Sequence, residues 1–500
     1  MQRGFSTLEL LIAMALMVVT LSAVIEVSFG NQDMLVSGEM NAEALRMAQT
    51  LLEEEQQLAR KDFKLVNPIA VTTNGPYDTS VTVEPWPGDP YTTKRVTAHV
   101  NWSDARHVTR GVALTTLVSN FVSASGADTC ISALTGDWSA PQKTDYQLAS
   151  GSLLPSGFLG NYPLSDIDAS RGTLYVAVAS TSAAARANFF VFDVNPSGMP
   201  VYVNSTDNNP SSIDGINAVQ IAGIQAFVAN AHDANFKTCK PGANCSQLQI
   251  FNLNTLSTPP VNFLIPTSTP PFVLGNMTSN NQAVGKSLFY KDGYVYLGLT
   301  KTASGPEFNI IDVHDPATPA WVGSFSVGAS INAIYVRNNY AYLATDDSSR
   351  ELIILDVGNP ASPILALGTV INPGGLGFGR SLYGVGDTLY LGRTFANGAK
   401  ELYLLDVADP STNMSAPLGS LVIGSSVNAL VVRDYLAFLV TSTTKRIHIL
   451  NISNPASITP FAPALSLPGT GATLDCEQNV LYAGSNGTGT GFLSVITSGP

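Results

Sequence analysis

Apolar residues are distributed unevenly along the chain, and the first region they mark is a long helix. The run Leu10–Ile25 is apolar apart from two hydroxyl residues, and good helix formers with an irregular apolar stripe follow it. Pro68 ends any helix that reaches it. The pattern predicts one helix over Ser6–Phe63, roughly 85 Å long at 1.5 Å per residue. Its apolar part is long enough to cross most of a bilayer, which predicts a transmembrane helix over residues 5–29.

The next region alternates between apolar and polar positions. Residues 80–86, 95–102 and 111–118 read as three half-buried strands separated by turns. We expect them to form a small antiparallel sheet against the outer half of the helix. Residues 122–129 are small and polar and predict a linker.

One strand motif then recurs seven times, at a period of about 48 residues with one longer gap. The motif is an aromatic residue flanked by aliphatic or small residues, centred on Tyr175, Phe227, Tyr296, Tyr342, Tyr390, Phe438 and Tyr482. Short strands at this period predict an all-β propeller with seven blades, in which the aromatics belong to the core. The longer gap, between Phe227 and Tyr296, indicates an insertion on one rim, where propellers usually carry function.

A second apolar strand follows six of the seven copies and carries Asp or Asn as its sixth residue. Such a side chain is best explained as a turn former that accepts hydrogen bonds from nearby backbone amides. The seventh copy lacks an outer strand. We expect residues between about 130 and 160 to supply that strand and close the ring.

Composition and charge narrow the choice of partners. The chain is 45% hydrophobic and 12% charged, with a net charge of −12. An acidic chain repels phosphates, so we expect no nucleic acid partner.

The N-terminus carries an acidic residue, Glu9, at the edge of its apolar run. A carboxylate there needs a partner, and cleavage before Phe5 would create one in the new α-amino group. These residues resemble the prepilin signal of type IV pilins and type II secretion pseudopilins: a short basic leader, Gly4 at the cleavage point, Phe5 as first mature residue and Glu9 as fifth. The alternative is an ordinary secretory signal, but no A-x-A cleavage site follows the apolar core.

This resemblance implies processing by a prepilin peptidase at Gly4 and Phe5, with Glu9 as the assembly residue. It divides the chain into a leader (1–4), a pilin-like α+β domain (5–121), the linker and a propeller (130–500). It also implies an inner-membrane precursor with a cytoplasmic N-terminus and a periplasmic propeller, later part of a pilus or pseudopilus. One departure is Glu26, which stands where many pilins have a helix-kinking proline.

The repeated strand with its following [DN]-P turn resembles the LVIVD repeat family over about residues 130–500. The family is defined by structure and is commonly surface-associated, so the resemblance implies a propeller and no reaction.

Four cysteines fit two disulfide bonds. Cys239 and Cys245 flank a Pro-Gly turn, which suits a local bond in a rim loop. Cys130 lies where the propeller begins and Cys476 in its last repeat, so a bond between them would lock the ring. A metal site is less favoured, because four soft ligands are needed and no C-x-x-C pair exists.

No catalytic motif is present, and we predict that the protein is not an enzyme. None of the five histidines has metal-binding spacing or an adjacent nucleophile; they are His99, His107, His232, His314 and His448. We expect no cofactor. The acidic segment 345–351 could hold Ca²⁺, but a solvated turn explains it better.

Three functions remain. The first is a minor type IV pilin whose propeller binds a surface ligand or partner protein, at a filament tip where bulky heads do not crowd. The second is a type II secretion pseudopilin that contacts cargo or the outer-membrane gate. The third is a tethered propeller enzyme, which convergent acidic or histidine side chains in the central channel would favour.

Overall fold

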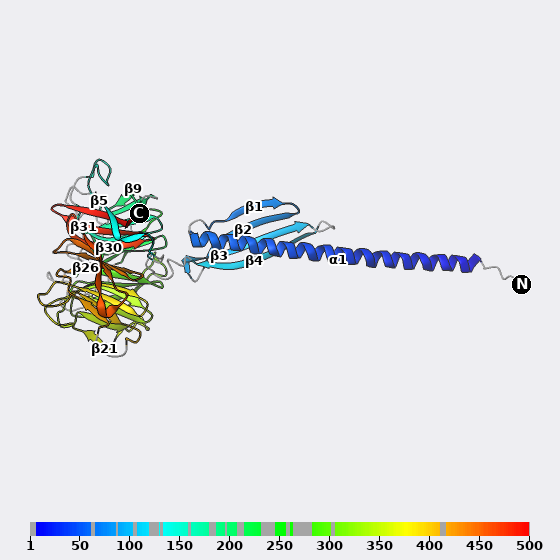
Figure 1. The fold of residues 1–500 in the computed structure, drawn as a ribbon. Coiled ribbons are helices and arrows are strands. Elements are labelled where there is room, and N and C mark those ends of the chain that lie inside the picture. Colours follow the sequence, from blue (N-terminus) through cyan, green and yellow to red (C-terminus); the bar gives the residue numbers. More distant parts are fainter. Residues whose placement is uncertain are drawn as a thin grey trace. The chain divides into compact units, whose positions relative to one another are not determined.

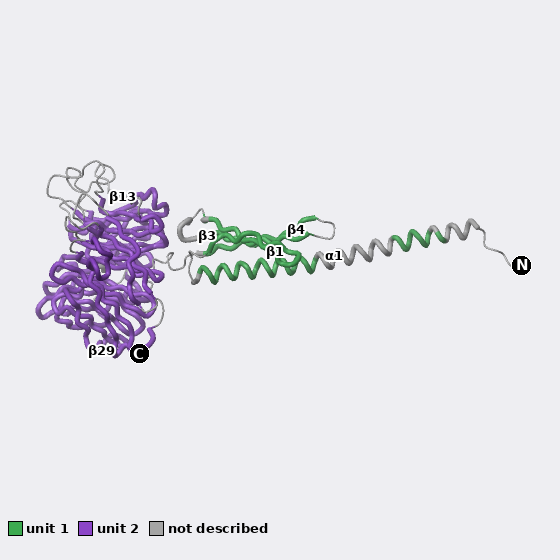
Figure 2. The backbone as a smooth tube through the Cα atoms, turned by 90° about the horizontal axis from the view of Figure 1, so that it is seen from above, with its two compact units in different colours: residues 1–121 green, residues 122–500 purple. Residues whose placement is uncertain are grey.

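The computed structural model describes most of the chain, which divides into two compact units at residues 1–121 and 122–500 (Figure 2). The described ranges are 7–61, 66–86, 89–103, 108–119, 130, 134–158, 162–179, 187–195, 198–207, 215–231, 246–256, 261–263, 283–301, 306–410 and 417–499. The predicted linker and most of the predicted rim insertion lie outside these ranges.

The first unit consists of one helix and one sheet (Figure 1). Helix α1 runs without interruption over Thr7–Lys61. The sheet is antiparallel, with its strands in chain order: β1 (Ile69–Asn74), β2 (Tyr77–Trp86), β3 (Asp89–Ser103) and β4 (Thr109–Ser119). Three of the strands match the predicted ones, and β1 was missed because all six of its residues are exposed and carry no alternating pattern.

Small side chains bring the C-terminal half of α1 onto the sheet. Ala44 and Ala48 are fully buried, and Leu52 is nearly so, in a cluster with Val96, Val100 and other apolar residues of the strands. Because alanine adds little volume, the helix backbone can approach the sheet closely at these two positions. The Tyr77 hydroxyl also donates a hydrogen bond to the carbonyl oxygen of Met40 in α1.

The fold class predicted from the sequence is wrong in its transmembrane element. Within the described part of the chain, no helix combines the length and the apolar character that crossing a bilayer requires. A span needs about 20 consecutive apolar residues, whereas Glu9 and Glu26 bound a shorter apolar run in α1. The predicted inner-membrane precursor, with the inner membrane as a partner, depended on that span and is also wrong.

The second unit is a β-propeller. Its described strands form seven four-stranded antiparallel sheets, the blades, and strands follow one another in chain order within blades 1–6. The innermost strands contact one another in sequence, from blade 1 through blade 7 and back to blade 1, and so close a ring.

The strand bounds are, for blade 1, β6 (Leu164–Ser170), β7 (Thr173–Val178), β8 (Phe189–Val194) and β9 (Pro200–Thr206); for blade 2, β10 (Ile216–Ala222), β11 (Gln225–Asn230), β12 (Leu248–Asn252) and β13 (Val261–Phe263); for blade 3, β14 (Gly285–Lys291), β15 (Tyr294–Leu299), β16 (Phe308–Asp312) and β17 (Ala320–Phe325); for blade 4, β18 (Ile331–Arg337), β19 (Tyr340–Thr345), β20 (Leu352–Asp356) and β21 (Ile364–Ile371).

Those of the remaining blades are, for blade 5, β22 (Gly379–Val385), β23 (Thr388–Arg393), β24 (Leu402–Asp406) and β25 (Gly419–Leu421); for blade 6, β26 (Val427–Arg433), β27 (Leu436–Thr441), β28 (Arg446–Asn451) and β29 (Thr459–Ser466), with the short 3₁₀ helix η2 (Pro455–Ser457); and for blade 7, β30 (Thr470–Glu477), β31 (Val480–Gly487), β32 (Thr490–Gly499) and β5 (Asp137–Gln147).

The repeated aromatic residues lie in the second strand of each blade, and all seven are buried. They pack between neighbouring blades: Tyr296, for example, joins a cluster with Ile331 and Ile334 of the next blade. Their predicted place in the core is confirmed.

Five of the six repeated Asp or Asn side chains form turns, as predicted. Asn252, Asp312, Asp356, Asp406 and Asn451 each accept a hydrogen bond from the backbone N–H two residues ahead, at 2.8–3.0 Å. Each side chain thereby starts the turn that leads toward the outer strand of its blade.

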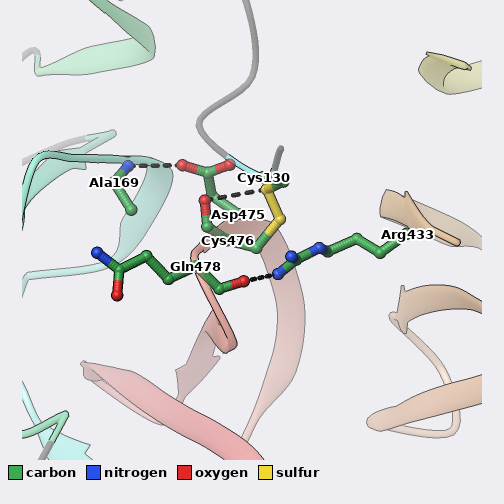
Figure 3. The surroundings of a disulfide bond; sticks show 6 residues. All are labelled: Cys130, Ala169, Arg433, Asp475, Cys476 and Gln478. Carbon is green, nitrogen blue, oxygen red and sulfur yellow. Dashed lines mark hydrogen bonds between the residues drawn. A yellow bond between two sulfur atoms is a disulfide. The ribbon is translucent and has the colours of Figure 1, made fainter. Parts of the chain in front are cut away.

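Blade 7 is completed by a strand from the beginning of the unit. Strand β5 pairs antiparallel with β32, so the chain end is held by its own first strand, as predicted. Cys130 and Cys476 are joined by a disulfide bond across a sequence separation of 346 residues (Figure 3). Next to it, the Asp475 carboxylate accepts a hydrogen bond from the backbone N–H of Ala169 in blade 1.

Candidate binding site in the propeller channel

The seven inner strands surround a cavity of about 930 Å³ along the axis of the ring. This volume lies within the range of small-molecule sites, about 300–1,000 Å³. Every blade contributes lining residues from its inner strand. The cavity is therefore the main candidate site among the described residues.

Each inner strand contains a β-bulge near its start, and the bulged residues form a ring. The pairing register with the second strand skips one residue in each blade, namely Ser165, Asn217, Lys286, Asn332, Arg380, Asn428 and Ala472. A bulge redirects the side chain of the residue it frees from pairing. Because all seven inner strands occupy equivalent positions in their blades, these residues lie at one end of the channel.

In blades 2, 4 and 6 the bulged residue is an asparagine that fastens the blade to the next one. The Nδ2 atoms of Asn217, Asn332 and Asn428 donate to the carbonyl oxygens of Gly285, Gly379 and Gly471, at 2.7, 2.6 and 2.6 Å. The acceptor is always the residue just before the next blade's bulge.

In blades 3 and 5 a serine after the bulge fastens the blade instead. Ser287 Oγ donates to the carbonyl of Ile331 at 2.9 Å, and Ser381 Oγ donates to that of Val427 at 3.0 Å. Space for each serine comes from a glycine on the neighbouring strand. A Cβ atom at Gly298 would lie 2.4 Å from Ser287 Oγ, which a real side chain does not tolerate.

Among the described residues, this alternation leaves the bulged residues of blades 3 and 5, Lys286 and Arg380, without a hydrogen bond to the backbone of the next blade; Arg380 contacts only the Asn428 side chain there. Both line the cavity. Burial lowers the pKa of each; for Lys286, the nearby Asp346 opposes this effect and the positive charge of Arg380 adds to it. Both side chains line the same cavity, and the charge of Arg380 reaches Lys286 across blade 4.

The acidic residues of the channel, by contrast, are engaged with backbone amides of neighbouring blades. Asp166 accepts from the N–H of Val219 and from the Thr473 hydroxyl, and Asp168 accepts from the N–H of Ile221. Burial raises the pKa of Asp166 to about 6, although these hydrogen bonds act in the opposite direction. The acids of blades 1 and 7 therefore hold the ring together.

Buried glutamates serve a similar structural role just before the third strands of their blades. Glu307 and Glu401 each accept two backbone N–H groups from the turn before the next blade, those of residues 327–328 and 423–424. Glu351 of blade 4 instead forms a fully buried, bidentate ion pair with Arg393 of blade 5.

The predicted site residues are only partly described by the structure. Gly4, Phe5, Cys239, Cys245 and the side chain of Glu9 lie outside the described residues. In the acidic segment 345–351, Asp347 accepts from the Ser349 N–H and hydroxyl and from Arg350, and these contacts lower its pKa to about 2.

Lys286 and Arg380 were missed from the sequence. The signal was present as an alternation of Ile/Val-Asn-Ala with Gly-Lys/Arg-Ser at the start of the inner strands. This alternation becomes visible only when the starts of the inner strands are aligned blade by blade. Only the β-bulge in the structure shows that Lys286 and Arg380 line the channel. The described lining residues include no histidine or cysteine. Of the converging acidic or histidine side chains that would favour an enzyme, the described channel therefore contains only acids, and these are already engaged in joining blades.

The fold and its channel define a seven-bladed β-propeller protein. Residues 330–369, which cover most of blade 4, match the LVIVD repeat. A search of curated protein sequences found no match.

Solved propeller structures are similar to this chain at low identity. BamB from Moraxella catarrhalis is 14% identical, with a TM-score of 0.40, 67% of this chain covered and 83% of BamB. A putative 6-phosphogluconolactonase from Bacteroides uniformis is 10% identical, with a TM-score of 0.44 and coverages of 74% and 92%. The WD40 propeller domain of Doa1 is 12% identical, with a TM-score of 0.42 and coverages of 71% and 97%. The strand order of the seven sheets, rather than these similarities, defines the propeller.

Proposed function

We propose that this protein is a minor filament subunit of the type IV pilin class, in which α1 assembles with helices of other subunits and the propeller is a binding head. The observation that carries the proposal is the apolar surface of α1. Met14, Leu16, Met17, Val18, Val19 and Leu21 are 59–68% exposed. Large contiguous apolar surfaces of this kind mark interaction sites.

The arrangement of these side chains favours a bundle over a simple pair of helices. Residues 16–19 are consecutive, so their side chains point in all directions around the helix. A helix that is apolar all round is covered on every side. Other helices of the same kind are the occupants that fit, because the sheet of the same unit covers α1 only over its C-terminal half.

The resemblance of the N-terminus to prepilin signals supports the same assignment. We infer that a prepilin peptidase cuts between Gly4 and Phe5, and that the Glu9 carboxylate then pairs with the α-amino group of Phe5 in a neighbouring subunit. A carboxylate inside an apolar bundle is unfavourable unless a positive charge compensates it. Cleavage would supply that charge where the leader had blocked it.

Two measurements test the proposal. Intact mass analysis of the protein from its native host should show a chain that begins at N-methylated Phe5. In a filament-shearing assay, Glu9→Gln should reduce incorporation into sheared filaments at least tenfold, whereas Glu39→Gln, at an exposed position of the same helix, should leave it unchanged. A mature chain that still carries residues 1–4, or full incorporation of the Glu9→Gln variant, would contradict the proposal.

A further inference from the structure

We propose that the channel of the propeller binds a small oxyanion, a carboxylate or phosphate group, between Lys286 of blade 3 and Arg380 of blade 5. This inference rests on the proposed role of the propeller as a binding head and names the ligand chemistry of that head. It follows from which polar groups of the channel are already engaged and which are not.

The inter-blade contacts of the channel account for most of its polar side chains. The asparagines of blades 2, 4 and 6 donate to the next blade, and the serines of blades 3 and 5 do the same. The acids Asp166 and Asp168 of blade 1 and Asp475 of blade 7 accept backbone amides. Each of these groups is therefore already engaged in a contact between blades.

The two cations differ from this set. No side-chain hydrogen bond of Lys286 occurs among the described residues, and Arg380 makes one, from Nε to Asn428 Oδ1 at 3.3 Å. That contact leaves both terminal nitrogens of the guanidinium group available. A guanidinium presents a planar pair of donors that matches a carboxylate or a phosphate, and an ammonium adds a point charge.

The position of the two cations argues against a purely structural role. Lys286 and Arg380 flank blade 4, and between them in the ring stands the bulged residue Asn332, whose Nδ2 atom joins blade 4 to blade 5. The positive charge of Arg380 lowers the pKa of Lys286, and Asp346, which raises that pKa, also accepts the backbone N–H of Ser330. An anion bound between the two cations would therefore add a favourable partner for both. Surface lysines and arginines elsewhere, such as Lys291 and Arg337, are engaged with Asn338 and Asp387.

The test is calorimetric titration of the purified full-length protein with sodium D-glucuronate and with inorganic phosphate, using neutral glucose as the reference sugar. We expect saturable, salt-sensitive binding of at least one of the two anions and none of glucose. Binding of glucuronate alone identifies a carboxylate ligand, and binding of phosphate alone identifies a phosphate ligand. Absence of binding for both anions would overturn the inference.

Variants locate the site. The double variant Lys286→Gln/Arg380→Gln should weaken binding about tenfold or more, as expected for the loss of charge-assisted hydrogen bonds. Lys291→Gln/Arg337→Gln makes the same change in net charge outside the cavity lining and should change the Kd less than twofold. The Lys286→Arg variant keeps the charge and should keep most of the affinity. Circular dichroism of each variant checks that it is folded.

Equal weakening by both double variants would show a general charge effect and overturn the assignment of the site. Failure of this inference is distinguishable from failure of the proposed function, because filament incorporation depends on α1 and is measured in the shearing assay. A chain that assembles through Glu9 but binds neither anion would keep the first proposal and reject the second.

Discussion

The two units bury glutamate side chains in different ways. In the helix-and-sheet unit, Glu55 of α1 is 2% exposed, and its Oε2 atom lacks a hydrogen-bond partner among the described residues. Burial raises the pKa of Glu55, and Glu54 adds to this effect while Lys94 partly offsets it. In the propeller, Glu351 is equally buried, but Arg393 faces it with both carboxylate oxygens engaged.

The difference follows from how each unit is closed. The propeller is a ring, so every inner position has a neighbouring blade that can supply a cation, a backbone amide or a hydroxyl group. The first unit is an open pair of layers whose helix extends beyond the sheet, and no further layer is available within the unit. Closure therefore provides Glu351 with a cation from the next blade, whereas no described residue of the open unit forms a hydrogen bond with the Glu55 Oε2 atom.

The largest expected effect comes from opening the ring. Cys130→Ser/Cys476→Ser should lower the stability of the propeller by up to about 5–6 kcal/mol, because the bond closes a loop of 346 residues in the unfolded chain. Thermal unfolding with and without a reductant measures this, and hydrogen exchange on peptides of each unit shows where it acts. An equal loss of protection from exchange in peptides of residues 1–121, or no loss in peptides of the propeller, would contradict the idea that ring closure stabilises the propeller alone.

The next effect concerns the buried ion pair. Arg393→Met leaves the Glu351 carboxylate buried without its partner and should cost about 3–5 kcal/mol in the free energy of unfolding of the propeller. Glu351→Gln/Arg393→Met removes both charges and should recover much of that loss. Chemical denaturation of the single and double variants measures the coupling. If the double variant were as unstable as the single one, packing of Arg393 rather than its charge would be responsible.

The smallest effect is a pH dependence in the helix-and-sheet unit. Because the pKa of folded Glu55 is raised above 4.5, its ordinary value, the folded state holds a proton that the unfolded state releases. The stability of this unit should therefore fall as pH rises from 4.5 through the raised pKa. Glu55→Gln should flatten this dependence and stabilise the unit at neutral pH by about 1 kcal/mol, allowing for solvent screening.

Hydrogen exchange of peptides from residues 38–61 between pH 4 and 7 measures this dependence. Glu53→Gln, at an exposed position of the same helix turn, is the control and should leave the slope unchanged. An unchanged slope in the Glu55→Gln variant would show that another group titrates in this range.

Much of the fold was predictable because the repeated patterns depend on residues that are close together in the sequence. The buried aromatic at the centre of each second strand and the Asp or Asn near the end of the third strand in six blades are visible in sequence, since period-2 alternation and turn chemistry depend on near neighbours. Strand β1 was missed because it lies exposed at the sheet edge. The transmembrane prediction was wrong because it extended the apolar run past Glu9, which limits it on one side as Glu26 does on the other.

By itself, the amino-acid sequence determined the long helix, the repeated blades and the need for a closing strand from residues of about 130–160, all of which arise from hydrophobic periodicity along the chain. Only the tertiary structure decided which polar residues of the channel are engaged and which are available. Asn332 and Arg380 occupy equivalent bulges, yet the first donates to Gly379 of the next blade, while Ser381 takes over that task in the blade of Arg380. The physical reason is that a hydrogen-bond partner from another blade is remote in sequence, so its identity is set by the ring and not by the local pattern.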